Sequence, residues 1–184
     1  MRPGGRFRLI TGLAFIPLLL SCSIRLTEPE RFPDAVRLHD VVPYTQEPEQ
    51  CGPYALASLL EYMGIRTDPA GLSSRLYSPG AGGTLTMDLF LEAGRQGLDA
   101  RQVRGSAGQL RDEIRENNPV IVLLNYPGLS RKAGHFVLVA GYSDHPPGVF
   151  LVWGDGKLSW MNQEKFDTFW SGSESWMLTV RAKR

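Results

Sequence analysis

Cys51 is the residue of this chain whose type and setting are best suited to nucleophilic chemistry. A cysteine attacks only as its thiolate, and a helix N-terminus or a neighbouring imidazolium lowers the pKa of a thiol. Gly52 and Pro53 follow Cys51, and proline is favoured in the first turn of a helix because the N–H that it lacks has no partner there. Apolar residues recur at helical spacing over 56–63, and Gly64 is a suitable left-handed cap. The sequence therefore predicts a helix whose positive dipole end lies at Cys51.

A thiol nucleophile needs a base, and His135 is the best placed of the 3 histidines. His39 lies in the amino-terminal approach and His145 in a proline-rich turn, so we expect both to be solvated loop residues. His135 follows Gly134 and opens an apolar strand, where its ring would face a groove. A structural histidine is the alternative interpretation.

Gln46 is a candidate for stabilising charge in the reaction, because it lies five residues before Cys51. A side-chain amide at that position can join the Cys51 backbone N–H in binding the oxyanion of a tetrahedral intermediate, which typically contributes about 3 to 4 kcal/mol. Gln50 competes by residue type, although an immediate neighbour of the nucleophile usually points elsewhere. Plain surface residues are the alternative for both.

The start and stop signals of the amino-terminal half predict mostly helix. Asp68-Pro69 opens a second helix that runs to about residue 77. The glycine-rich stretch 78–83 is a loop that another segment of backbone can approach closely. A third helix runs from about Thr86 to Gly97, and Ser106 with Gln109 forms the capping box of a fourth helix that stops before residue 119.

The carboxy-terminal half changes to strands. Short apolar runs bounded by turn signals lie at 120–124, 136–142, 149–153, 157–161 and 176–180, with a short helix at 163–170. Two short extended pieces, 36–38 and 41–44, lead toward Gln46. Helices followed by an antiparallel sheet indicate an α+β domain, with the helical part packed on the sheet and the active site between them.

Asp155 is the best candidate to orient the His135 ring. If the strands that end at Tyr142 and begin at Val149 form a hairpin, His135 faces a residue near 156. Asp144 is nine residues from His135, roughly 30 Å along a strand, which is too far. A carboxylate that accepts the second imidazole N–H fixes the tautomer of the ring. A turn aspartate within Gly-Asp-Gly is the alternative role for Asp155.

The first 21 residues have the layout of a secretory signal peptide. Three arginines precede an apolar run, 9–20, that is too short to span a bilayer and ends in Leu-Leu-Ser-Cys at 19–22. These four residues resemble the lipobox of bacterial lipoproteins, in which the signal is cut before a cysteine that is then acylated. The resemblance implies lipid on Cys22, and Ser23 in the next position implies the periplasmic face of a Gram-negative outer membrane. A plain signal peptide or an uncleaved anchor is the alternative.

Lipid on Cys22 would leave Cys51 as the only thiol, because the chain has 2 cysteines. Structural cysteines of exported proteins normally come in pairs. A disulfide would then not explain Cys51, and a free buried core cysteine is the alternative.

Without residues 1–21, the chain has 163 residues, enough for one domain with a core. We expect a tether at 22–34 and a folded domain at 35–184. The 163 residues carry 17 basic and 19 acidic side chains, with no basic patch interleaved with aromatic residues. We therefore do not expect this protein to bind nucleic acid.

Four segments together resemble the bacteriocin-processing, or double-glycine, peptidases, which have papain-like folds. The segments are Val-Pro-Tyr-Thr-Gln at 42–46, Gln-Cys-Gly-Pro-Tyr-Ala-Leu-Ala at 50–57, Gly-His-Phe-Val-Leu-Val-Ala-Gly-Tyr at 134–142 and Gly-Asp-Gly at 154–156. The resemblance covers about residues 41–180. It implies that Cys51 is the nucleophile, His135 the general base, Asp155 the residue that orients the ring and Gln46 the oxyanion donor.

Two positions depart from the family pattern: Gln50 stands where the family more often has Asp, and Gly156 where it often has Pro. Transporter segments that some members carry are also missing from this sequence. We expect an exported, lipid-anchored cysteine peptidase that uses no metal or cofactor, since Cys51 and His135 lack the ligand clusters of a zinc site. The alternatives are a transferase or amidase acting on cell-wall peptides or an exported polymer, or a non-catalytic binding adaptor whose tryptophans stack on sugars.

Overall fold

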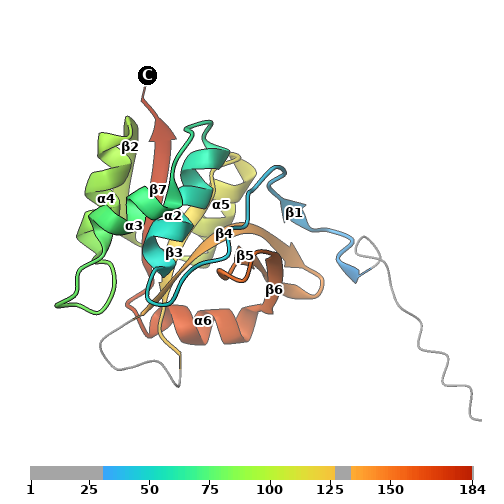
Figure 1. Cartoon of the computed structure of the whole chain (residues 1–184). Coiled ribbons are helices and arrows are strands. Elements are labelled where there is room, and N and C mark those ends of the chain that lie inside the picture. The colour runs from blue at the N-terminus through green and yellow to red at the C-terminus, as the bar shows by residue number, and fades with distance from the viewer. Residues whose placement is uncertain (1–30, 127–133, 184) are drawn as a thin grey trace, which may run out of the picture.

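The computed structural model describes residues 31–126 and 134–183. The predicted signal peptide at 1–21, Cys22 and the tether up to residue 30 lie outside the described residues. Seven strands form one antiparallel sheet (Figure 1): β1 Val36–Arg37, β2 Leu98–Arg104, β3 Val120–Leu124, β4 His135–Asp144, β5 Pro147–Val152, β6 Leu158–Asn162 and β7 Trp176–Ala182. The strand order is β2-β7-β3-β4-β5-β6, and β1 pairs with the outer part of β4.

The five helices of the described ranges are α2 Cys51–Tyr62, α3 Pro69–Leu76, α4 Thr86–Arg95, α5 Ala107–Arg115 and α6 Gln163–Ser171. The predicted caps are confirmed. Asp68 accepts a hydrogen bond from the Ala70 N–H at 3.1 Å, and Ser106 accepts one from the Gln109 N–H at 3.2 Å. Gly64 follows α2 with a φ of 77°. None of the helices in the described ranges is long and apolar enough to cross a bilayer.

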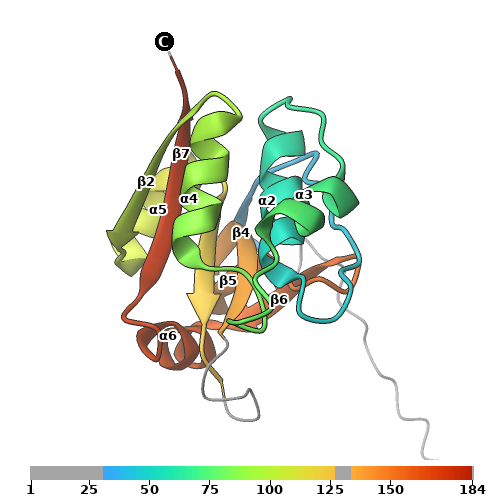
Figure 2. The ribbon, with the colours of Figure 1, turned by 60° about the vertical axis from the view of Figure 1, so that its left-hand side comes forward.

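The sheet has a hydrophobic core on each face. Neighbouring side chains of a strand point to opposite faces, so Ile121 packs with α2, α3 and α4, whereas Val120 and Val122 pack with α5 and α6. Figure 2 shows α6 near the end of β3. The α+β class is confirmed. The helices cover both faces of the sheet, because Leu110 and Ile114 of α5 belong to the core on the face opposite α2.

Strand β2 corrects the prediction that the amino-terminal half is helical. It pairs with β7 along its whole length, from Leu98 opposite Ala182 to Arg104 opposite Trp176. The sequence Leu-Asp-Ala-Arg at 98–101 alternates inward apolar with exposed charged residues, and this alternation is the signal that was available. The charges suit β2 because it is an edge strand of the sheet.

The folded domain includes residues that precede the predicted boundary at residue 35. Phe32 is 3% exposed, and its ring lies 5.0 Å from the Phe150 ring and 5.4 Å from the Trp160 ring. Asp34 accepts hydrogen bonds from the turn between β4 and β5: from the Ser143 hydroxyl at 3.0 Å and from the His145 N–H at 3.1 Å. The segment that leads into the domain is therefore fastened to this turn.

The Asp34 carboxylate gives the stability of the domain an acid dependence. The hydrogen bond with the His145 ring, at 2.5 Å, is the largest of the contacts that lower the pKa of Asp34 from 3.8 to about 2. A carboxyl whose pKa is lower in the folded state stabilises the fold above its unfolded pKa. This contribution is complete above about pH 4 and is lost as the pH falls toward 2.

We predict that Asp34→Asn lowers the Tm at pH 7, and that the difference from wild type disappears as the pH falls from 4 to 2. Thermal unfolding followed by circular dichroism across this range measures both. Glu47→Gln is the matched control, because Glu47 is an exposed carboxylate in the approach to α2. A Tm difference that persists unchanged at pH 2 would contradict the prediction.

Candidate active site

The N-terminus of α2 places Cys51 in a cleft of about 650 Å³ between the helical layer and the sheet. Three segments form the cleft: the approach to α2, the glycine-rich loop 80–86 and the ends of β3 and β4. Gln46, Cys51 and His135 all line it, although His135 follows Cys51 by 84 residues in the sequence. Gly52 lets the loop come close, since a Cβ there would lie 2.8 Å from the Thr84 Cβ.

The Cys51 thiol lies against the start of β4. The Phe136 N–H donates a hydrogen bond to Cys51 Sγ at 3.5 Å, so the sulfur is held beside the residue that follows His135. Burial raises the pKa of the Cys51 thiol, although the N–H groups of Phe136, Gly52 and Cys51 itself act in the opposite direction. In this site, loss of hydration outweighs the favourable dipoles of the helix start.

The His135 ring is buried and held in one orientation. Its exposed fraction is 7%, and Nε2 lies 2.9 Å from the backbone oxygen of Trp153. A carbonyl only accepts hydrogen bonds, so Nε2 carries the hydrogen and Nδ1 of the neutral ring keeps a lone pair. Burial lowers the pKa of His135, against the raising effect of the Trp153 carbonyl. The resting ring at neutral pH is therefore a neutral base.

Aromatic rings surround His135. The Trp153 ring lies 4.7 Å from the imidazole between centroids, and the Tyr126 ring lies 6.2 Å away in an edge-on arrangement. These contacts exclude water from one side of the imidazole. Neither tyrosine nor tryptophan at these positions was predicted to belong to the site.

The structure does not join the Asp155 carboxylate to the His135 ring. Leu138 pairs with Val152, and three further residues of that register would put Asp155 opposite His135, as the sequence predicts. However, β5 ends at Val152, and Gly154, with a φ of 101°, turns the chain away. The Asp155 carboxylate lies 3.2 Å from Lys157 Nζ. The Trp153 carbonyl takes the place that the sequence assigned to Asp155, and a backbone group carries no residue-type signal.

Gln46 is fixed against the loop that contains Gly154. Its N–H donates to the Gly154 oxygen at 2.9 Å, and Thr45 forms a bridge with Asp155. A Cβ on Gly154 would lie 2.1 Å from Gln46 Oε1, so only glycine leaves room for this side chain. Gln50 caps α2 outside the set of residues that line the cleft. Its Oε1 is buried and has no hydrogen-bond partner among the described residues.

The other histidines lie where the sequence predicts. His39 is exposed, and His145 lies in the turn after β4 with 83% of its side chain exposed. Asp144, at the far end of β4, pairs with Arg111 at 2.8 Å. The structure thus confirms that Asp144 does not reach His135.

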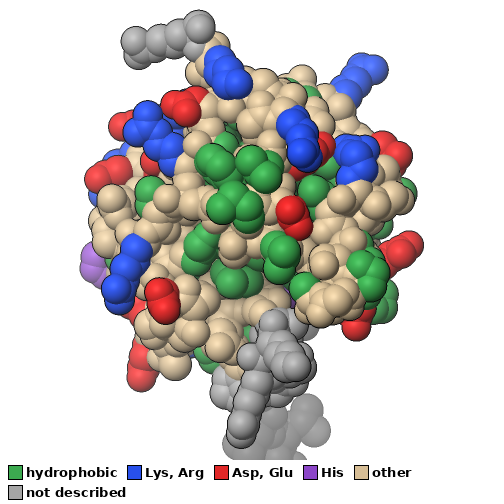
Figure 3. All heavy atoms as spheres, turned by 90° about the vertical axis from the view of Figure 1, so that its left-hand side faces the viewer, with side chains coloured by type: hydrophobic (Ala, Val, Ile, Leu, Met, Phe, Trp, Pro, Cys, Tyr) green, Lys and Arg blue, Asp and Glu red, His purple; other side chains and the backbone are tan. Residues whose placement is uncertain are grey.

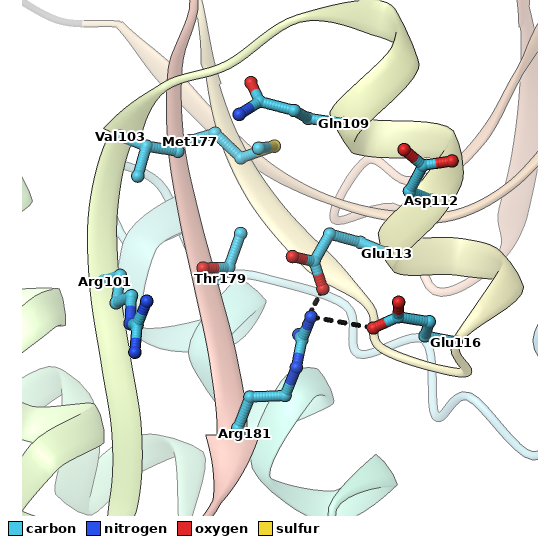
Figure 4. A pocket seen from close by; sticks show the side chains of 9 residues that line it. All are labelled: Arg101, Val103, Gln109, Asp112, Glu113, Glu116, Met177, Thr179 and Arg181. Atoms are coloured by element: carbon cyan, nitrogen blue, oxygen red, sulfur yellow. Dashed lines mark hydrogen bonds and ion pairs between the residues drawn. The ribbon is translucent and has the colours of Figure 1, made fainter.

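A second hollow, of about 240 Å³, lies between β2, β7 and α5 (Figure 4). In this hollow, Arg181 contacts Glu113 and lies 3.0 Å from Glu116. Within the described ranges, no three His, Cys, Asp or Glu side chains are arranged to hold a metal ion. The cleft at Cys51 is the hollow that Cys51 and His135 line together.

Three peptidase structures are among the solved structures that resemble this chain. The peptidase domain of Streptococcus ComA, a bifunctional ABC transporter, matches with a TM-score of 0.65 at 20% identity, over 79% of this chain and 100% of that domain. A C39-like peptidase from Bacillus anthracis matches with a TM-score of 0.66 at 19% identity, over 82% and 100%. A double-glycine-motif protease from an AMS/PCAT transporter, solved in complex with a leader peptide, matches with a TM-score of 0.64 at 19% identity. The match covers 80% of this chain and 94% of that protease.

These likenesses show the fold. Comparison with curated protein sequences finds no match. The sequence profile of the Peptidase C39 family matches residues 41–183, which include Gln46, Cys51, His135 and Asp155. The chain therefore belongs to the Peptidase C39 family and is a cysteine peptidase of papain-like fold.

Proposed function

We propose that this chain is an exported, lipid-anchored peptidase that cleaves amide bonds with Cys51 as nucleophile and His135 as general base. The observation that carries the proposal is the single cleft that both side chains line, with Cys51 Sγ accepting the N–H of Phe136 next to His135. When the thiol and the ring are both neutral, the proton on Cys51 Sγ is the one that can move to the imidazole. Its transfer from Sγ to the imidazole creates the nucleophile and the acid together.

The reaction begins when the Cys51 sulfur forms a bond with the carbonyl carbon of the substrate amide. As the carbonyl oxygen becomes an anion, the side-chain amide of Gln46 and the Cys51 N–H donate hydrogen bonds to it. Donors of this kind contribute about 3 to 4 kcal/mol each, because they are oriented before the charge develops. The contact of Gln46 with Gly154 supports this role, since it holds the amide beside the cleft.

The intermediate collapses when the carbon–nitrogen bond breaks. His135 gives its proton to the leaving amine, and the acyl group stays on Cys51 as a thioester. The ring, again neutral, then takes a proton from water, whose oxygen attacks the thioester. The carbon–sulfur bond then breaks, the imidazolium returns this proton to the Cys51 sulfur, and the products are an amine, a carboxylic acid and the free Cys51 thiol.

A peptide substrate fits the cleft on the acyl side of the bond to be cut. Residues 80–83 present backbone with three glycines beside Cys51, and such backbone can pair with an extended peptide. Apolar side chains gather on the face that carries α4 (Figure 3). Leu85 and Met87, at the start of α4, are 49% and 51% exposed. We propose that an apolar part of the substrate, upstream of the cut, contacts this face.

We predict that Cys51→Ala and His135→Ala each lower kcat/KM for peptide hydrolysis by about 10⁴-fold or more, since each removes a group that forms or breaks bonds. Mass spectrometry of a peptide mixture incubated with each purified variant measures the loss. His145→Ala is the matched control and keeps wild-type activity, because His145 lies in an exposed turn. Full activity of Cys51→Ala would refute the proposal, and conjugates to an added amine would indicate a transferase.

We predict that Asp155→Asn changes kcat/KM by less than about fivefold, because its carboxylate forms an exposed ion pair with Lys157. The Trp153 carbonyl still orients the His135 ring in this variant. Lys157→Ala, which removes the other partner of the same ion pair, is the comparison. A fall of about 10⁴-fold in Asp155→Asn alone would instead assign the orienting role to the carboxylate.

The lipid anchor is a separate part of the proposal, and it rests on the lipobox at 19–22. Acylated Cys22 would hold the domain at the bacterial envelope, on the periplasmic face of the outer membrane. We predict that Cys22→Ala moves the protein from the membrane fraction to the soluble fraction, measured by immunoblot of separated envelopes. Ser21→Ala is the control, since a small residue stays before the cysteine. Unchanged fractionation of Cys22→Ala would argue for an uncleaved anchor.

A further inference from the structure

A hollow of about 530 Å³ is lined by Tyr126 and Trp153, the two residues whose rings contact His135. It has no part in the mechanism described above. It lies between β5, β6 and α6, and its walls are mainly aromatic: Tyr126, Trp153, Trp160 and Phe169, with Met161 beside them. Lys165 Nζ lies 5.5 Å from the Phe169 ring, at the rim. A hollow with walls of this kind suits one apolar side chain with a flat or branched shape.

The walls of this aromatic hollow are continuous with the surroundings of His135. Trp153 contacts the imidazole at 4.7 Å, and Tyr126 contacts the imidazole, Trp153 and Phe169, the last two at 5.5 Å. The backbone oxygen of Trp153 also holds Nε2. One residue thus both orients the base and forms a wall of the hollow.

The mechanism determines which part of a substrate lies here. His135 protonates the amine that leaves, so this nitrogen comes within hydrogen-bond distance of the ring. The acyl side of the substrate lies at Cys51 and the loop 80–86, which line the cleft, whereas Trp153 lines the aromatic hollow. A residue extends the chain by about 3.3 Å. The side chains of the first residues after the cut therefore lie within reach of Tyr126 and Trp153.

We propose that the aromatic hollow is a specificity site for the leaving-group side of the substrate, where it binds an aromatic or large aliphatic side chain. The proposal rests on the proposed function, because the direction of the substrate follows from the role of His135. It predicts that peptides with Phe or Leu just after the cut are better substrates than peptides with Gly there. Burial of one such side chain corresponds to about 10- to 100-fold in kcat/KM.

Binding to the hollow is measured without catalysis in the Cys51→Ala protein. Phenylalanine amide represents the leaving amine, glycine amide is its counterpart without a side chain, and the fluorescence of Trp153 and Trp160 reports occupancy. We expect saturable binding of phenylalanine amide that is about 10-fold or more tighter than that of glycine amide. Equal affinities, or no fluorescence change with either amide, would overturn the proposal.

Two wall variants, made in the Cys51→Ala protein, test the location. Phe169→Ala removes an aromatic wall, and Ser159→Glu adds a charge to the hollow from β6. Each should weaken binding of phenylalanine amide about 10-fold, whereas Leu91→Ala, on the outer face of α4, should not. The second variant keeps the test valid if loss of Phe169 unfolds the domain. Unchanged binding in the folded wall variants places the ligand elsewhere and refutes the proposal.

A catalytic arm separates this proposal from the proposed function. Peptides that differ only in the residue after the cut are compared in wild type and in Ser159→Glu, and the ratio of kcat/KM for Phe over Gly should fall toward one in the variant. If wild type binds phenylalanine amide but cuts no peptide, the proposed function fails and the binding site stands. If it cuts both peptides equally well, the specificity site fails and the peptidase stands.

Discussion

The central constraint of this structure is that a half-buried thiol and a buried imidazole line one cleft, where loss of hydration disfavours the charged form of each. Burial raises the pKa of Cys51 and lowers the pKa of His135, so each group alone prefers its neutral form. A proton that moves from one to the other creates two opposite charges side by side, which stabilise each other in a site of low polarity. The chemistry therefore depends on the pair, and the helix dipole at Cys51 assists it without being sufficient.

The rest of the fold holds Cys51 and His135 in the same cleft. The start of α2 supplies Cys51, β4 supplies His135, and the Phe136 N–H links the two elements at the sulfur. The loop after β5 adds the other supports: its Trp153 oxygen holds the ring, and its Gly154 seats Gln46. One short loop thus contacts both His135 and Gln46, and the close approach of Gln46 gives Gly154 a structural reason to be glycine.

Local signals predicted the elements well, because capping residues and apolar runs act over a few neighbours. Asp68 and Ser106 cap their helices as expected. The sequence did not predict strand β2, because its charged residues hide a short alternation of buried and exposed positions. Such charges are acceptable on an edge strand. Cys51 and His135 meet in the cleft as residue types suggested, but the Trp153 carbonyl has no sequence signature. The turn at Gly154 and the burial that sets both pKa values arise from tertiary packing, which no single segment contains.

The most direct test is the pH dependence of the rate at which iodoacetamide alkylates Cys51, in wild type and in His135→Ala, with His145→Ala as the control. A thiolate formed by proton transfer to His135 gives a plateau of reactivity. The plateau should extend from below the ordinary histidine pKa of about 6.5 to above the ordinary thiol pKa of about 8.5. His135→Ala should lack the plateau and react only at high pH. Identical profiles in wild type and His135→Ala, rising with a single thiol titration, would contradict the account.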